Sequence, residues 1–174
     1  MKTNFKIILF CIFSFAFISC DRVTKNIAKE QLMNREPTSY FHDTFRLEYA
    51  ENTGAALSLG ATLPQPYNFI LLSVVPMLFL SALFIYALIK IKEFTLIRIL
   101  SFALVFAGGV GNIIDRVLFD RHVTDFMNFG IQNIRTGIFN VADVCITAGV
   151  IGLFFSYQNE KAATDQVNAH SKTI

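Results

Sequence analysis

Four apolar runs divide the chain, and their lengths predict how it folds. The apolar run over residues 67–89 carries no charged residue, and about 20 apolar residues are enough for a helix to cross the hydrocarbon core of a bilayer. Two further runs extend over about 96–118 and 138–157, the second interrupted only by Asp143. These three runs predict three membrane-spanning helices.

The first apolar run, residues 7–20, has only 14 residues and allows two interpretations. A run of this length suits a signal peptide as well as a span. In one interpretation "FISC" (17–20) is a cleavage box, and Cys20 becomes the lipidated first residue of a secreted protein. In the other, a retained helix covers about 7–28, with Asp21 and Lys25 near its outer end. Hydropathy alone leaves both open.

Composition supports the membrane class and excludes others. The 174 residues are 53% apolar and 16% charged, with a mean hydropathy of +0.49, which is too apolar for an ordinary soluble domain of this size. A net charge of +2 provides no basic surface for nucleic acid. The three Cys and three His show neither C-x-x-C nor H-E-x-x-H spacing, so we expect no metal site. The predicted fold class is an all-α integral membrane protein, a bundle of four transmembrane helices.

Polar residues inside the third run are candidates for function, because ionisable groups in a span are costly unless they are paired or face a wet cavity. In "AGGVGNIIDR" (107–116), three polar residues at i, i+3 and i+4 share one helix face. Gly108 and Gly109 precede this face and allow another helix or a substrate to come close. The acid is either part of a site or a local partner of the neighbouring arginine. The three polar residues are Asn112, Asp115 and Arg116.

Two carboxylates flank the connection between the third and fourth runs. Asp125 lies in "HVTDF" (122–126), where an isolated acid is usually a turn or cap residue. In "FNVAD" (139–143), Asn140 can cap the fourth helix and Asp143 falls in its first turn. Because one short connection joins them, both acids should lie near the same membrane face. Two adjacent carboxylates cannot both ionise easily, so the pair could act as acid and base in peptide hydrolysis.

A turn in the first polar segment is a further candidate. In "AENTGAALS" (50–58), Thr53 and Gly54 predict a tight turn, and Asn52 could hold a backbone group of a substrate. The preceding "TFRLEYA" alternates apolar and polar residues, as a short strand does. The alternative is a plain hairpin turn beside the bundle.

Charge bias does not fix the orientation of the bundle. The connector "KIKEFTLIR" (90–98) is rich in Lys and Arg, as cytoplasmic loops are, and four spans would then place both termini in the cytoplasm. However, the proposed inside carries seven Lys or Arg and the proposed outside eight. The polar tail 159–174 has no hydrophobic pattern and is predicted to be disordered.

Taken together, five motifs resemble, in order, those of the lipoprotein signal peptidases, the signal peptidase II family. They are "DRVTK" (21–25), "NTGAALS" (52–58), "GGVGNIIDR" (108–116), "VTDF" (123–126) and "FNVAD" (139–143). The resemblance covers residues 21–143. At the second position of the first motif, the family usually has Gln where this chain has Arg22.

The resemblance implies a bacterial aspartic endopeptidase of the cytoplasmic membrane, which cuts signal peptides from diacylglyceryl-modified prolipoproteins before the lipidated cysteine. It implies one peptidase domain over 1–158 with a retained first helix, an extracytoplasmic segment 29–66 that includes a small β-rich platform over 40–66, and cytoplasmic termini. No cofactor is implied; the partners would be prolipoproteins and membrane lipid, and the protein would act as a monomer. The implied residues are Asp125 and Asp143 as the catalytic dyad, Asn52, Gly54, Asn112, Arg116, Asn140, Asp21 and Lys25 as substrate-binding or supporting residues, and Asp115, Gly108 and Gly109 as structural residues.

Two other functional classes stay open at this point. Intramembrane Asp, Asn and Arg also mark the pathways of small ion- or proton-coupled carriers, which would not cleave any peptide. A non-enzymatic lipoprotein tethered at Cys20 would lack residues 1–19 and carry added lipid in its mature form.

Overall fold

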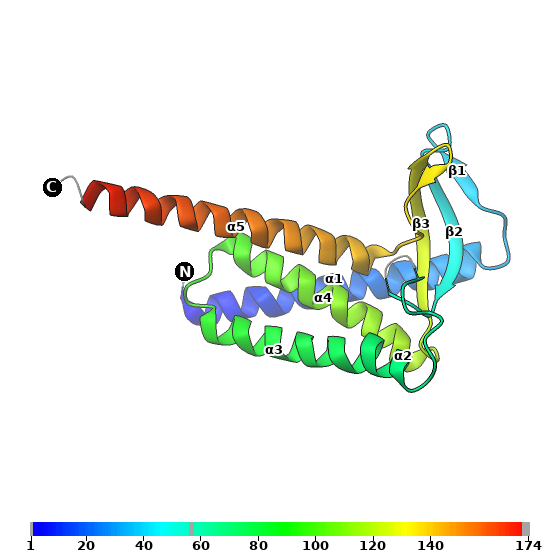
Figure 1. Cartoon of the computed structure of the whole chain (residues 1–174), viewed down its shortest axis with the longest axis horizontal. Helices are drawn as coiled ribbons and strands as arrows, with labels where there is room; N and C mark the ends of the chain where they lie inside the picture. Colours follow the sequence, from blue (N-terminus) through cyan, green and yellow to red (C-terminus); the bar gives the residue numbers. More distant parts are fainter. Residues whose placement is uncertain (1, 56–57, 172–174) are drawn as a thin grey trace.

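The computed structural model describes residues 2–55 and 58–171 and shows a helical bundle with a small sheet at one end (Figure 1). Within these residues, four helical segments are long and apolar enough to cross a membrane. A short π-helical turn interrupts the second segment near its start. The helices are α1 (Thr3–Leu32), α2 (Tyr67–Phe69), η2 (Ile70–Val74), α3 (Val75–Lys90), α4 (Leu96–Leu118) and α5 (Val141–Ser171).

The sheet joins two segments that lie far apart in the sequence. Its four antiparallel strands follow one another in spatial order, and the pairing of β2 with β3 places Ala50 opposite Asp125. The predicted fold class, a helical bundle with a small β-rich part, is confirmed. Residues 53–66 form no strand where the structure describes them, and the second half of the sheet comes from the α4–α5 connection instead. The strands are β1 (Thr38–Tyr40), β2 (Phe45–Asn52), β3 (Val123–Ile131) and β4 (Ile134–Arg135).

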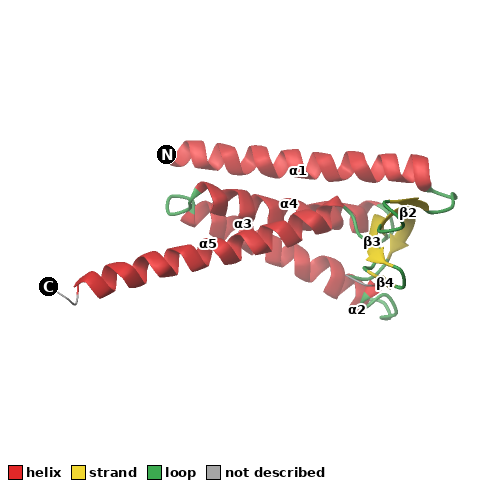
Figure 2. Ribbon diagram, turned by 90° about the horizontal axis from the view of Figure 1, so that it is seen from above, coloured by secondary structure: helices red, strands yellow, loops and turns green. Residues whose placement is uncertain are grey.

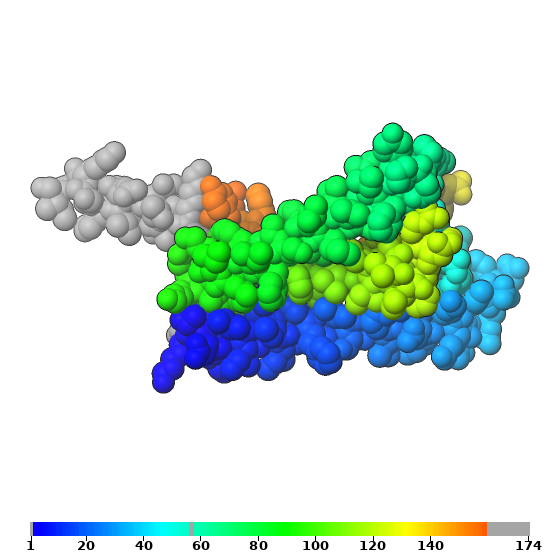
Figure 3. All heavy atoms as spheres, turned by 90° about the horizontal axis from the view of Figure 1, so that it is seen from below, coloured from blue at the N-terminus to red at the C-terminus, as the bar shows by residue number. Residues whose placement is uncertain are grey.

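The two ends of the bundle differ. The first residues of α1 and the last turns of α5 lie at the end away from the sheet (Figure 1). Seen from above, α4 runs between α1 and the other helices (Figure 2), and it carries more buried residues than any other described helix. The space-filling view shows α1 and α3 side by side at the end away from the sheet, with α4 visible between them nearer the sheet (Figure 3).

Aromatic packing closes the end of the bundle that lies away from the sheet. Phe10 of α1 is fully buried there, and the rings of Phe94 and Phe102 stack with their centroids 4.8 Å apart. The ammonium of Lys6 donates hydrogen bonds to the carbonyl oxygens of Lys92 and Phe94, both at 2.7 Å. These contacts tie the start of α1 to the connector between α3 and α4.

Glycines let α4 approach its neighbours closely, as the sequence predicts. A Cβ on Gly108 would lie 2.3 Å from the carbonyl oxygen of Ala142, so a side chain there would push α5 away. A Cβ on Gly109 would instead meet the side chain of Leu80 on α3 at 2.7 Å. The two glycines therefore serve two different helix contacts.

The fourth helix differs from the predicted run at both ends. It begins at Val141 rather than 138, because Phe139 is extended and exchanges backbone hydrogen bonds with Met127 of β3. It continues to Ser171, although the sequence predicts a disordered tail from 159. No Gly or Pro occurs between 153 and 171, and Ala, Glu, Lys and Gln are good helix formers. Residues 172–174 lie outside the described part.

The first helix is longer than the apolar run that predicts it. It passes through Cys20 without a break and ends at Leu32. Asp21 and Lys25 therefore lie on the same helix as the run 7–20, and both are buried against the rest of the bundle.

Candidate functional site

Asp125 lies at the junction of the sheet and the bundle. The sequence treats it as an isolated acid in a loop, but it is on strand β3 and its side chain is buried. Its carboxylate accepts two hydrogen bonds, from the side-chain amide of Asn52 at 3.1 Å and from that of Asn140 at 2.6 Å. The loop prediction is wrong because "VTDFMNF" continues as a strand that pairs with β2, a partner that the local pattern does not reveal.

Asp143 lies in the first turn of α5, as the sequence predicts. Its Oδ1 accepts a hydrogen bond from the side-chain amide of Asn112 at 2.8 Å, and its Oδ2 accepts one from the backbone N–H of Asn140 at 3.1 Å. In return, Oδ1 of Asn140 accepts the backbone N–H of Asp143 at 3.0 Å. This reciprocal cap satisfies two donors at the start of the helix.

Asn140 links the two carboxylates. Its backbone N–H bonds to Asp143, while its side-chain amide donates to Asp125 and to Oδ1 of Asn112. The same residue therefore caps α5 and reaches both acids. The cap that the sequence predicts at Asn140 is therefore present, and the same side chain also contacts Asp125.

The turn that follows β2 lies beside these side chains. Oδ1 of Asn52 accepts the backbone N–H of Gly54 at 2.8 Å, which is the side-chain turn expected from this sequence. A Cβ on Gly54 would lie 2.4 Å from the backbone of Ser58, so the turn requires glycine. Arg116 donates to the carbonyl of Gly54 at 2.8 Å and so holds the turn against α4. Of "NTGAALS", residues 56 and 57 lie outside the described part.

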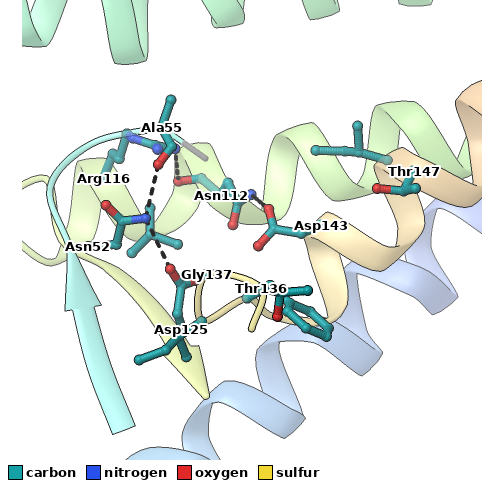
Figure 4. Close-up of a pocket in the computed structure, with 13 residues that line it drawn as sticks. Asn52, Ala55, Asn112, Arg116, Asp125, Thr136, Gly137, Asp143 and Thr147 are labelled. Atoms are coloured by element: carbon teal, nitrogen blue, oxygen red, sulfur yellow. Dashed lines mark hydrogen bonds between the residues drawn. The ribbon is translucent and has the colours of Figure 1, made fainter. Parts of the chain in front are cut away.

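These side chains surround one cavity of about 430 Å³. Figure 4 shows Asn52 reaching Asp125 from the strand side and Asn112 reaching Asp143 from the helix side. A second groove of about 440 Å³ shares Asp143 with this cavity and continues along the exposed face of α5 to Ile151. The lining residues of the cavity are Asn52, Ala55, Asn112, Arg116, Val123, Asp125, Thr136, Gly137, Ile138, Phe139, Asp143, Ile146 and Thr147.

The surroundings of Asp125 favour a protonated carboxyl group. Burial raises the pKa of Asp125 to about 6, the hydrogen bond from Asn52 opposes this rise, and the charge of Asp143 adds to it. A carboxyl group with this pKa exchanges its proton close to neutral pH. The cavity thus brings together two carboxyl groups, and one of them has a raised pKa.

Asp115 lies behind this cavity and has different partners from those predicted. It does not pair with Arg116 but forms ion pairs with Arg22 and Lys25 of α1. Arg116 points to the other side, toward the turn at Gly54. The i, i+4 spacing puts Asn112 and Arg116 on one face, whereas Asp115 faces α1. No local pattern could show this, because the two cations that pair with Asp115 are 90 or more residues away in the sequence.

Sequence reasoning missed two residues near the site. Asn68 of α2 donates to the carbonyl oxygens of Thr53 at 3.3 Å and Gly60 at 2.9 Å, which fixes the turn after β2 to the second span. Thr136 lines the cavity and accepts a hydrogen bond from the backbone of Phe129. The sequence offered one signal for Asn68, a polar residue at the start of an apolar run. It offered no signal for Thr136.

Comparison with known proteins connects this geometry to a family. The family model described as "Signal peptidase (SPase) II" matches residues 13–158. A lipoprotein signal peptidase from Chlorobaculum parvum is 37% identical, covering 84% of this chain and 92% of its own length. Those from Clostridium acetobutylicum and Borreliella afzelii are 34% and 33% identical and cover 83% and 90% of this chain, each over 91% of its own length.

A solved structure agrees with the fold. A bacterial membrane enzyme determined by the in meso method at 2.3 Å resolution superposes with a TM-score of 0.75 and 27% identity, over 89% of this chain and 90% of the other. The resemblance found in the five motifs is therefore confirmed over most of the chain. This chain belongs to the signal peptidase II family, and it is a membrane endopeptidase of the aspartic type.

Proposed function

We propose that Asp125 and Asp143 are the catalytic dyad of this peptidase. The observation that carries the proposal is that both carboxylates line one cavity and are bridged by Asn140. Burial raises the pKa of Asp125, which suits this residue to supply the proton of the pair. Asp143, which accepts two N–H hydrogen bonds at the start of α5, acts as the base.

The proton transfers follow from this division. Asp143 takes a proton from a water molecule, whose oxygen attacks the carbonyl carbon of the scissile bond. Asp125 gives its proton to the carbonyl oxygen, which forms a neutral tetrahedral intermediate. As the C–N bond breaks, Asp143 returns its proton to the leaving amine and Asp125 recovers one from the hydroxyl group. Asn52, Asn112 and Arg116 hold the carboxylates and the turn in place.

The substrate is a diacylglyceryl-modified prolipoprotein, cut before the lipidated cysteine. The names of the relatives support the prolipoprotein class. The groove that leaves the cavity at Asp143 supports the lipid requirement, because exposed apolar side chains of α5 line it as far as Ile151. No described feature favours a carrier, and family membership decides against a tethered lipoprotein.

We also propose that the sheet lies on the extracytoplasmic side, with cytoplasmic termini. Lys90 and Lys92 lie near the end of the bundle away from the sheet, as does Lys6. Two of the positive residues that obscure the charge bias, Arg22 and Lys25, are paired with buried carboxylates. The chain acts as a monomer in this proposal, since all the residues of the site come from one copy.

The first test is a comparison of substrates. Purified wild-type protein in detergent should release the signal peptide from a diacylglyceryl-modified prolipoprotein, and it should not cleave the same chain without the lipid. A gel shift with mass analysis of the new N-terminus measures this directly. Equal cleavage of the two substrates would contradict the lipid requirement, and cleavage elsewhere than before the cysteine would contradict the proposed cutting position.

The dyad also predicts how activity depends on pH. Because Asp125 must be protonated to act as the acid, kcat/KM should fall as pH rises through its pKa, about 6. The hydrogen bond from Asn52 stabilises the ionised form, so its loss raises the pKa. We therefore expect Asn52→Ala to move the falling limb of the profile to higher pH. The control is Asn133→Ala, which removes an exposed amide from the turn between β3 and β4 and should leave the limb in place. A limb that moves to lower pH in Asn52→Ala would contradict the assignment.

A further inference from the structure

A buried ionic cluster lies directly behind the two carboxylates of the site. It consists of Asp21 and Lys25 on α1 and Asp115 on α4, which we call the α1 clamp. All three residues are almost completely buried, with exposed fractions of 1%, 2% and 0%. Buried charges inside a helical bundle are costly unless they are paired, and such charges are usually functional.

The two acids of the α1 clamp each hold the backbone next to one dyad residue. Oδ2 of Asp115 accepts the backbone N–H of Thr124 at 3.3 Å, and Thr124 immediately precedes Asp125 on β3. Oδ1 of Asp21 accepts the backbone N–H of Ala142 at 2.9 Å, and Ala142 immediately precedes Asp143 on α5. Each carboxylate therefore fixes one of the two elements that carry the dyad.

Lys25 joins these two carboxylates. Its ammonium forms ion pairs with Oδ2 of Asp21 at 2.9 Å and with Oδ2 of Asp115 at 2.8 Å. It also donates a hydrogen bond to Oδ1 of Asn112 at 3.0 Å. Because that amide oxygen faces Lys25, the amide nitrogen of Asn112 is presented to Asp143.

We propose that Lys25 is a positioning residue, which sets the separation of Asp125 and Asp143 by holding Asp21 and Asp115 together. The inference rests on the proposed function, since it assigns a role relative to the dyad. A chain of contacts runs from Thr124 through Asp115, Lys25 and Asp21 to Ala142, and four polar contacts fix its length. Apart from this chain of contacts, β3 and α5 are joined by the connecting residues 132–140, which include β4, and by the side chain of Asn140.

The surrounding structure is shaped to admit this cluster. A Cβ on Gly111 of α4 would lie 2.6 Å from Oδ2 of Asp21, so only glycine leaves room for that carboxylate. Buried ion pairs contribute little net stability compared with apolar side chains of similar size. Catalytic groups, by contrast, must be held to within about half an ångström. The need to position the catalytic groups therefore explains this cluster better than a gain in folding stability does.

The test separates positioning from folding with two variants. Lys25→Met removes the link, but it leaves the buried Asp21 without its cation and Asp115 with Arg22 alone, so this variant can lose the fold. The second variant, Asp21→Asn with Lys25→Met and Asp115→Asn, is neutral, and each Asn keeps an oxygen to accept its backbone N–H. We expect this triple variant to fold and to bind substrate with KM within about twofold of wild type, while kcat falls at least about tenfold, as misplaced catalytic groups cause.

A matched control removes the hydrogen-bonded ammonium of another lysine on the same helix. Lys6→Met deletes two hydrogen bonds at the far end of α1, so it should lower the melting temperature and leave kcat unchanged. If the triple variant cleaves with the kcat of wild type, or if Lys6→Met lowers kcat as strongly at an equal loss of stability, the inference is wrong. Asp125→Asn in the same assay tests the dyad itself: if that variant cleaves normally, the proposed function fails, whatever the clamp variants do.

Discussion

Asp125→Asn and Asp143→Asn should each abolish release of the signal peptide while leaving the protein folded. An amide can neither carry the acidic proton of Asp125 nor take a proton from water in place of Asp143. Loss of a general acid or base costs about 10² to 10⁴ in rate, and residues that act as a pair lose nearly all of their joint effect when one is removed. We therefore expect at least about a 10³-fold loss in kcat for either variant.

The experiment compares initial rates of cleavage of a lipidated prolipoprotein, with thermal unfolding measured for each variant. Asp120→Asn is the matched control, because Asp120 lies in the connection just before β3 and its side chain is 85% exposed. It should cleave at the rate of wild type. The double variant should be no slower than either single one, since the dyad acts as a unit. Normal cleavage by a folded Asp125→Asn or Asp143→Asn would rule out the dyad.

The bundle could be predicted from the sequence because a bilayer imposes a length on apolar helices. The runs 67–89 and 96–118 coincide closely with helical segments, since hydropathy and helix rise decide their extent. The cap of α5 could be predicted for a similar reason, because the interaction between Asn140 and Asp143 is local. Helix ends and caps depend on residues a few positions apart.

The interior of the site could not be predicted in the same way, because its contacts join distant segments. The pairing of β2 with β3 brings Asn52 to Asp125 across 73 positions. Asp115 and Arg116 are neighbours in the sequence, yet the first faces α1 and the second faces the turn at Gly54. Only the order of the five motifs carried this information, since it reflects a whole fold rather than a local pattern.

Gly108→Ala should severely impair both stability and activity, although alanine adds only one methyl group. That Cβ would lie 2.3 Å from the carbonyl oxygen of Ala142 and 2.8 Å from the side chain of Ile146, so α4 and α5 must separate. Overpacking of a close contact costs about 1–3 kcal/mol or more. Because Ala142 immediately precedes Asp143, the same displacement moves a dyad carboxylate, and we expect kcat to fall at least about tenfold.

Gly109→Ala distinguishes this mechanism from a general intolerance of larger residues in α4. The three atoms nearest to its Cβ would all belong to the side chain of Leu80 on α3, which can change rotamer, and α3 carries no residue of the dyad. We expect a smaller loss of thermal stability than in Gly108→Ala and a kcat close to that of wild type. Thermal unfolding and initial cleavage rates of the two variants side by side provide the measurement. Equal losses of kcat in the two variants would mean that the close approach of α4 to α5 does not position Asp143.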